Sequence, residues 1–208
     1  MSLIIERAEY LLSAHNARQL PEDGGHEVAF AGRSNAGKSS ALNAMTRQNS
    51  LARVSKTPGR TQQLVFFQVQ PERYLVDLPG YGYAKVPHEL QVHWQAFIDR
   101  YFRTREALRG LVVVMDIRHP LKDYDRQMLR YAVERGLPAH ALLTKADKLG
   151  RGQQGQALQQ VRKDLSSVWA DSVSVQLYSS ESRQGVDELR GIVGGWLELE
   201  PRAAAAQD

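Results

Sequence analysis

The motif that most constrains the fold of this chain has the form G-x-x-x-x-G-K-S. It directly follows the apolar run at residues 28–31 and precedes a helical stretch, which is the strand, loop and helix context of a phosphate-binding loop. Two glycines let the backbone turn so that successive N–H groups point inward, and the next helix adds its positive N-terminal end. We expect this loop to cradle a polyphosphate. Its members are Gly32, Arg33, Ser34, Asn35, Ala36, Gly37, Lys38 and Ser39.

The last two side chains of the motif carry its polar chemistry. We expect Lys38 to reach the terminal phosphates, and the Ser39 hydroxyl to hold a Mg²⁺ ion that bridges two of them. The simpler alternative is a glycine-rich turn that only starts a helix. The full match of the motif in the required context favours the phosphate loop.

Length and composition indicate one globular domain. The chain of 208 residues is long enough for a full single core and short for two domains. No apolar run approaches the roughly 18 residues of a membrane span, and the first residues lack the regions of an export signal. The absence of cysteine excludes disulfides and thiolate metal sites. We expect a cytoplasmic monomer that engages no membrane.

Positive charge is concentrated around the motif. The net charge is +4, and residues 28–71 contain no Asp or Glu. The Lys and Arg residues in this stretch are Arg33, Lys38, Arg47, Arg53, Lys56 and Arg60. Apart from Lys38, we expect them to form an uncompensated basic surface near the loop. Such a surface attracts nucleic acid, or it only helps to hold the nucleotide.

Apolar runs alternate with segments of helical period along the chain. The runs at 27–31, 64–69, 74–76, 111–115, 139–143 and 173–177 predict strands, and the segments at 38–45, 88–103, 122–135, 158–168 and 186–197 predict helices. Residues 47–62 read as a mobile loop, and 150–155 as a flexible link. The pattern predicts an α/β fold with a mostly parallel, doubly wound sheet and one antiparallel strand from a hairpin.

The expected domain occupies residues 26–198. Residues 1–25 carry a short apolar patch and a turn-rich link, and we expect them to pack on the core as an N-terminal extension. Residues 199–208 are expected to form a flexible tail.

Polar motifs follow the predicted strands where ligands of such sheets bind. The first is Asp77-Leu78-Pro79-Gly80. A carboxylate at Asp77 can hold a Mg²⁺-bound water, and the Gly80 N–H can contact a terminal phosphate. The same sequence is also a common turn, but its place after a strand favours the ligand site.

Thr61, in the loop before the hairpin, is a candidate second hydroxyl for Mg²⁺. A contact made only while the γ-phosphate is present would order the loop, and hydrolysis would release it. A loop threonine without a ligand is the simpler interpretation from the sequence alone.

Thr144-Lys145-Ala146-Asp147 predicts which base is bound. A carboxylate at Asp147 can accept paired hydrogen bonds from the N1 and N2 groups of guanine, a pattern that adenine does not offer. This argues against an ATPase or a P-loop kinase. Lys145 would lie along the base or brace the phosphate loop, and the region of Ser179 and Ser180 would close over the base.

Longer segments carry a family resemblance. GRSNAGKSS, SKTPGRTQ, DLPGYGYAKVP, MDIRHPLKDYD and LLTKADKL resemble the bacterial EngB (YihA, YsxC) family of GTP-binding proteins, within the translation-factor-like class of P-loop GTPases. The resemblance covers about residues 27–196. It implies a three-layer GTPase fold, binding of GTP and GDP, slow Mg²⁺-dependent hydrolysis, and a switch role in large ribosomal subunit assembly. It also implies a need for the protein in normal cell division and septation.

The resemblance implies the site residues one by one. Ser39, Thr61 and Asp77 would hold Mg²⁺. Lys38, Thr61, Gly80 and Asn35 would act in catalysis. The nucleotide contacts would be residues 32–39, then Gly59, Arg60, Thr61, Gln62, Gln63, Asp77, Leu78, Pro79, Gly80, Thr144, Lys145, Ala146, Asp147, Tyr178, Ser179 and Ser180.

Tyr81 stands where some GTPases place a water-orienting glutamine. It has no amide, so unaided hydrolysis should be slow. Part of the related class uses K⁺ held by an asparagine of the phosphate loop, and Asn35 is the matching residue; alternatively, Asn35 only hydrogen-bonds within the loop. The expected partner is ribosomal RNA or a precursor of the large subunit. The alternative function is a nucleotide-gated RNA- or ribosome-binding module in which hydrolysis is incidental.

Overall fold

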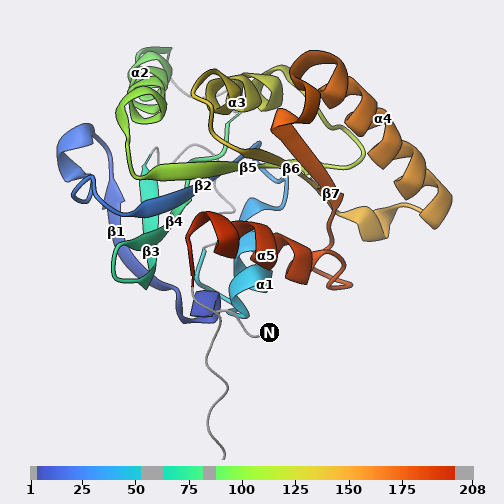
Figure 1. The fold of residues 1–208 in the computed structure, drawn as a ribbon, viewed down its shortest axis with the longest axis horizontal. Coiled ribbons are helices and arrows are strands. Elements are labelled where there is room, and N and C mark those ends of the chain that lie inside the picture. The colour runs from blue at the N-terminus through green and yellow to red at the C-terminus, as the bar shows by residue number, and fades with distance from the viewer. Residues whose placement is uncertain (1–3, 53–62, 82–87, 200–208) are drawn as a thin grey trace, which may run out of the picture.

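The computed structural model describes residues 4–52, 63–81 and 88–199. Its centre is a seven-stranded sheet in the order β1-β3-β4-β2-β5-β6-β7 (Figure 1). The strands are β1 (Glu9–Ala14), β2 (His26–Gly32), β3 (Leu64–Gln70), β4 (Arg73–Asp77), β5 (Leu108–Asp116), β6 (Ala139–Thr144) and β7 (Val173–Leu177). The predicted α/β fold is therefore confirmed.

Strand direction follows the prediction as well. β2 pairs in parallel with β4 and β5, and β6 pairs in parallel with β5 and β7. β3 is antiparallel to both of its neighbours, β1 and β4. The β3–β4 connection is short, and Glu72 in it has a φ of 60°. This is the predicted hairpin.

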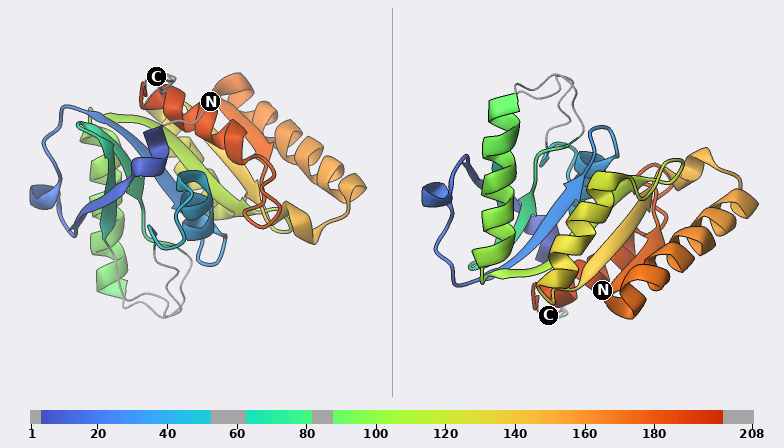
Figure 2. Two further views of the ribbon diagram at one scale, coloured as in Figure 1. Left: turned by 90° about the horizontal axis from the view of Figure 1, so that it is seen from below. Right: turned by 90° about the horizontal axis from the view of Figure 1, so that it is seen from above.

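Helices cover both faces of the sheet, which makes three layers. Figure 1 shows α2 (His88–Thr104), α3 (Asp123–Glu134) and α4 (Arg151–Trp169) on one face, with α1 (Lys38–Thr46) and α5 (Val186–Trp196) on the other. The two turned views of Figure 2 each bring one of these layers to the front.

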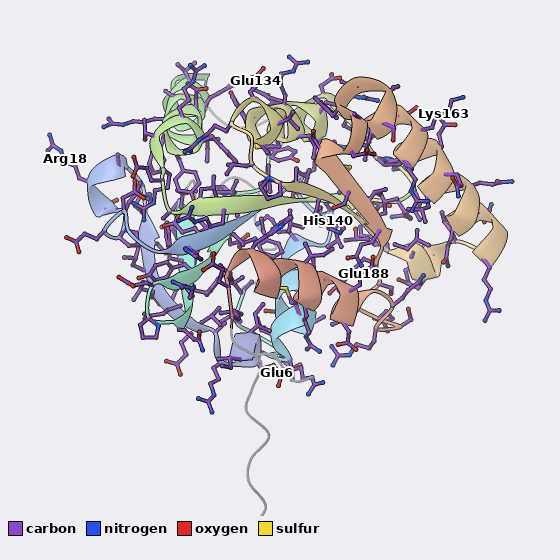
Figure 3. All side chains as sticks on the ribbon, viewed as in Figure 1. Glu6, Arg18, Glu134, His140, Lys163 and Glu188 are labelled. Atoms are coloured by element: carbon purple, nitrogen blue, oxygen red, sulfur yellow. The ribbon has the colours of Figure 1, made fainter. Side chains whose placement is uncertain are left out.

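The central strands are apolar on both faces because helices cover both. In β5, Leu111 and Val113 belong to the core beneath α2, α3 and α4, whereas Val112 and Val114 belong to the core beneath α1 and α5. Figure 3 shows His140 in the interior, whereas Arg18, Glu134 and Lys163 lie at the outer edge of the molecule.

The prediction for residues 150–155 was wrong, because α4 already begins at Arg151. The N-terminal turn is held by side chains: Gln153 Oε1 accepts from Gly150 N at 3.2 Å, and Gln154 Nε2 donates to Leu149 O at 2.9 Å. These bonds offset the low helix propensity of the glycines. At the other end, Val168, the last residue of the helical apolar pattern predicted at 158–168, is 57% exposed.

Strand β1 was not predicted. It pairs with β3 at the edge of the sheet, with an irregularity between Tyr10 and Leu12. Tyr10 is 62% exposed, so the strand lacks the alternation of a half-buried strand. Ile5, just before it, is fully buried. The first 25 residues thus contribute a strand to the sheet, and the domain limits at residues 26 and 198 stay predictions.

The predicted amphipathic helix at 88–103 is α2. Phe97, Ile98 and Tyr101 are buried as expected, and the side chains of Leu90 and Trp94 lie outside the described residues. So does the predicted tail beyond residue 199. Within the described ranges, no helix is both long enough and apolar enough to cross a bilayer.

Candidate nucleotide-binding site

The carboxyl ends of the parallel strands meet at one edge of the sheet. The register pairs Phe30 with Asp77 and Asp116 with Thr144. Gly32, at the end of β2, lies opposite Val114. The motifs predicted from separate parts of the sequence therefore come together at this edge, as expected for the ligand site of such a sheet.

The phosphate loop has the backbone that its sequence predicts. Gly37 has a φ of 96° and is the N-cap of α1, which begins at Lys38. A Cβ atom on Gly32 would lie 2.8 Å from Val114 O, so only glycine fits there without a shift. Asn35 has a φ of 61°, a value that asparagine tolerates better than most residues. Turn and helix together present backbone N–H groups to an anion.

Lys38 and Asp77 form an ion pair between the start of α1 and the end of β4. Their side chains are only 10% and 15% exposed. The ammonium group predicted to bind phosphate and the carboxylate predicted to bind metal are thus in direct contact. Ser39, the next residue of α1, is half-buried. Carboxylate and hydroxyl oxygens beside a phosphate cradle are the donor set that Mg²⁺ prefers, so these residues fit the ion.

The segment after Asp77 continues along the phosphate loop. Leu78 N donates to Phe30 O at 3.0 Å, and Ser34 N donates to Tyr81 O at 3.1 Å. A Cβ atom on Gly80 would lie 3.3 Å from Ser34 N. Gly80 therefore lies against the phosphate loop.

Asp147 is held as an ionised acceptor. Ser179 Oγ donates to its Oδ1 at 2.6 Å, and Lys148 Nζ lies 3.0 Å from its Oδ2. These two contacts, first the hydrogen bond from Ser179, hold the pKa of Asp147 below its usual value. An ionised carboxylate can accept both guanine N–H groups. Ser180 follows and is half-buried.

Lys145 braces the phosphate loop, one of the two roles expected for it. Its Nζ donates to Asn35 O at 2.6 Å and lies 3.0 Å from Asp116 Oδ2. Asp116 also accepts from Arg118, and these cations hold the pKa of Asp116 far below its usual range. The sequence interpretation missed Asp116. Its place at the end of the central apolar strand was the available signal.

Several residues of the predicted motifs have side chains in the interior. Thr144 Oγ1 bonds Ala36 O and lies 2.9 Å from Met115 O, which ties the loop to the ends of β5 and β6. Tyr178 is fully buried, with its hydroxyl donating to Ala41 O at 3.2 Å. Leu78 and Ala146 are also buried. These side chains support the site by packing.

Gly59, Arg60, Thr61 and Gln62 lie outside the described residues. Gln63 directly precedes β3, and because Val65 pairs with Asp77, it lies near the carboxyl end of β4.

The expectation of an uncompensated basic surface is corrected at Arg47. Its Nε lies 3.1 Å from Glu6 Oε1, so an acid distant in sequence compensates it. Arg53, Lys56 and Arg60 lie outside the described residues, and Arg33 is exposed.

A hollow of about 180 Å³ adjoins the phosphate loop on the side of α3. Loop residues 33–36 form one wall, and Asp116, His119, Asp125 and Lys145 contribute polar side chains to it. Asp125 is the second acid to which the sequence interpretation gave no role, although the family segment MDIRHPLKDYD ends on it.

A phosphate loop, a D-x-x-G segment beside it and a guanine-accepting carboxylate on a parallel sheet define a P-loop GTP-binding protein. A family model described as 50S ribosome-binding GTPase matches residues 27–145. The chain therefore belongs to this family of P-loop GTPases.

Curated relatives match over nearly the full chain. A probable GTP-binding protein EngB from Xanthomonas campestris pv. campestris is 84% identical over 207 residues, which is 99% of this chain and 100% of the relative. One of the same name from Stenotrophomonas maltophilia is 81% identical, over 96% of this chain and 100% of the relative. The chain belongs to the EngB family of GTP-binding proteins.

Solved structures share the fold at low identity. A probable GTP-binding protein EngB has a TM-score of 0.65 at 19% identity, covering 83% of this chain and 98% of the other. The G domain of the T. maritima FeoB iron transporter has a TM-score of 0.51 at 20% identity, covering 83% and 99%.

Proposed function

We propose that this GTPase is a slow, Mg²⁺-dependent molecular switch that acts in assembly of the large ribosomal subunit. The observation that carries the proposal is the contact between the phosphate loop and the D-x-x-G segment, through Tyr81 and Ser34. Because Gly80 lies against the loop, the backbone after it responds to the presence of a terminal phosphate. That response is what a switch requires.

The residues around the ion pair of Lys38 and Asp77 fit Mg²⁺. Ser39 and Asp77 would hold it, and Thr61 would be the third residue. When bound, the ion neutralises charge on the phosphates. Lys38 binds the terminal phosphates, Gly80 N–H orients the last one, and Asp147 selects guanine. Lys145 keeps the loop in shape through Asn35 O.

Hydrolysis is proposed to be slow because Tyr81 has no amide to orient water. Its hydroxyl is used elsewhere, in a hydrogen bond to Asp125. K⁺ near Asn35 would supply positive charge that an arginine finger supplies in other GTPases. The amide of Asn35 is exposed and its backbone is fixed by Lys145, which suits such a role.

The cellular role rests on the family. GTP would order the segments at Thr61 and Gly80 so that basic residues near the phosphate loop, other than the compensated Arg47, contact ribosomal RNA or a subunit precursor, and hydrolysis would release it. The printed description of the family model, a ribosome-binding GTPase, supports this choice of partner. We place the protein in the cytoplasm as a monomer, away from membranes, with a role in normal cell division and septation.

A nucleotide-gated binding module, in which hydrolysis is incidental, is the second candidate. Cosedimentation with ribosomal subunits in GTP, a non-hydrolysable analogue and GDP separates the two. A switch that uses hydrolysis for release stays bound with the analogue and dissociates with GTP over time. Equal dissociation with GTP and the analogue would favour the module, and no nucleotide-dependent binding in any state would contradict both.

A further inference from the structure

The side chain of Tyr81 joins the D-x-x-G segment to α3. Its hydroxyl donates to Asp125 Oδ1 at 2.8 Å, across 44 positions of sequence. The Tyr81 ring also lies 5.4 Å from the ring of Tyr124, tilted by 31°. Burial raises the pKa of Tyr81 well above its usual value, so the hydroxyl keeps the proton that it donates.

Asp125 is itself fixed in place. It is 1% exposed and lies in the first turn of α3. Its other oxygen, Oδ2, accepts from Lys122 N at 2.9 Å, which caps the start of the helix. A buried carboxylate with both oxygens engaged in hydrogen bonds is a rigid anchor for the tyrosine.

The backbone of Tyr81 is fixed to the phosphate loop at the same time. Tyr81 N donates to Gly32 O at 3.4 Å, and Tyr81 O accepts from Ser34 N at 3.1 Å. Arg33 and Tyr81 form an isolated parallel bridge. Gly80 precedes this doubly held residue, so its position depends on both attachments.

From this geometry we infer that Asp125 is a positioning residue that acts through Tyr81. The hydrogen bond from Tyr81 to Asp125 holds the Gly80 N–H where it receives the terminal phosphate of GTP. It therefore favours GTP over GDP, since GDP lacks that phosphate. The inference rests on the proposed contact between Gly80 and the terminal phosphate.

The test measures dissociation constants for fluorescent GDP and a fluorescent non-hydrolysable GTP analogue. Tyr81→Phe removes only the hydroxyl. We expect its affinity for the analogue, relative to GDP, to fall by about 3- to 10-fold, with GDP affinity within about twofold of the parent. Asp125→Ala should lower the same ratio, and the double variant should match Asp125→Ala, because both changes break one interaction.

Tyr101→Phe is the matched control. The Tyr101 hydroxyl also donates to a buried carboxylate, Glu27 Oε2, at 2.7 Å, but at the opposite end of β2. Tyr101→Phe should leave the ratio of analogue affinity to GDP affinity unchanged. An unchanged or increased ratio in Tyr81→Phe would overturn the inference, and so would an equal fall in Tyr101→Phe.

Gly80→Ala distinguishes the positioning role of Asp125 from the phosphate contact of Gly80. If it lowers the ratio of analogue to GDP affinity while Tyr81→Phe does not, the positioning role is wrong and the phosphate contact of Gly80 stands. Gly80→Ala keeps the N–H but adds a Cβ atom 3.3 Å from Ser34 N, which shifts the segment. If neither Gly80→Ala nor Tyr81→Phe changes the ratio, the position of this segment does not affect binding of the terminal phosphate, and the inference is wrong.

Discussion

Selection of the base is a property of one carboxylate at the residue scale. Asp147→Asn should weaken GTP binding by about 100-fold, because an amide accepts only one of the two guanine N–H groups and has lost the charge. Xanthine offers a carbonyl where guanine has its amino group, so XTP affinity should rise. Competition titrations against labelled GDP measure both effects.

Asp171→Asn is the control for this change. Asp171 is exposed just before the amino end of β7, away from the nucleotide edge, and the same substitution there should leave both affinities unchanged. Unaltered guanine selectivity in Asp147→Asn, or equal competition by ATP in the parent protein, would contradict the assignment of the base.

The proposed K⁺ dependence also belongs to the residue scale. GTP turnover should be several-fold faster in KCl than in NaCl at equal ionic strength, and Asn35→Ala should remove the difference, since its amide oxygen is the proposed ligand. Phosphate release at matched salt measures the rates. Equal rates in the two salts, or a K⁺ response that survives in Asn35→Ala, would rule the ion out.

At the element scale, β6 and β7 share a buried polar contact. His140 Nδ1 lies 2.8 Å from Ser174 Oγ, and its Nε2 lies 3.0 Å from Gln176 Oε1. Burial lowers the pKa of His140 to about 4. The unfolded chain, with a pKa near 6.5, therefore binds the proton first as the pH falls, and stability is lost between about pH 6.5 and 4.

Between pH 7 and pH 5, protonation of His140 in the unfolded chain should lower the free energy of unfolding by about 2 kcal/mol. His140→Asn should remove that part of the pH dependence, and urea unfolding at both pH values measures it. The exposed His15 gives the control, because His15→Asn should leave the difference between the two pH values as in the parent. An unchanged slope in His140→Asn would contradict the argument.

At the scale of the whole molecule, three segments of the chain meet at the edge of the sheet opposite the nucleotide-binding edge. Arg105, just after α2, donates through Nε to Glu27 Oε1 at 2.9 Å, at the start of β2. It also donates through Nη1 to Pro21 O at 2.8 Å. Glu27 is fully buried, and burial raises its pKa while Arg105 lowers it.

Arg105→Met should destabilise the protein by about 3–5 kcal/mol, because it leaves Glu27 as an unpaired buried charge. Adding Glu27→Gln should recover part of the loss, so the two changes should be non-additive in urea unfolding. Additive losses would show that the pair does not act as a unit. At urea concentrations too low to unfold these variants, their affinity for GDP should equal that of the parent protein, since the pair lies away from the nucleotide site.

Most of the fold could be predicted because local patterns determined it. The apolar run of β5 and the helical spacing of apolar residues in α2 both involve residues close together in the sequence, so each can be recognised without the tertiary structure. Local patterns failed at β1, an exposed edge strand, and at the glycines of α4, where side chains such as Gln153 and Gln154 hold the first turn. The miss at β1 comes from tertiary pairing with β3 that outweighs local preference, whereas the miss at α4 comes from local bonds between side chain and backbone that offset the glycines.

By itself, the sequence determined the order of strands and helices from β2 onward and the motifs at the strand ends, because short-range steric preference and apolar spacing specify both. Only the tertiary structure decided which side chains hold the site together. Lys145 reaches the Asn35 carbonyl across 110 positions, and Tyr81 reaches Asp125 across 44. No local pattern encodes such contacts, since they exist only when the parallel strands bring their ends to one edge of the sheet.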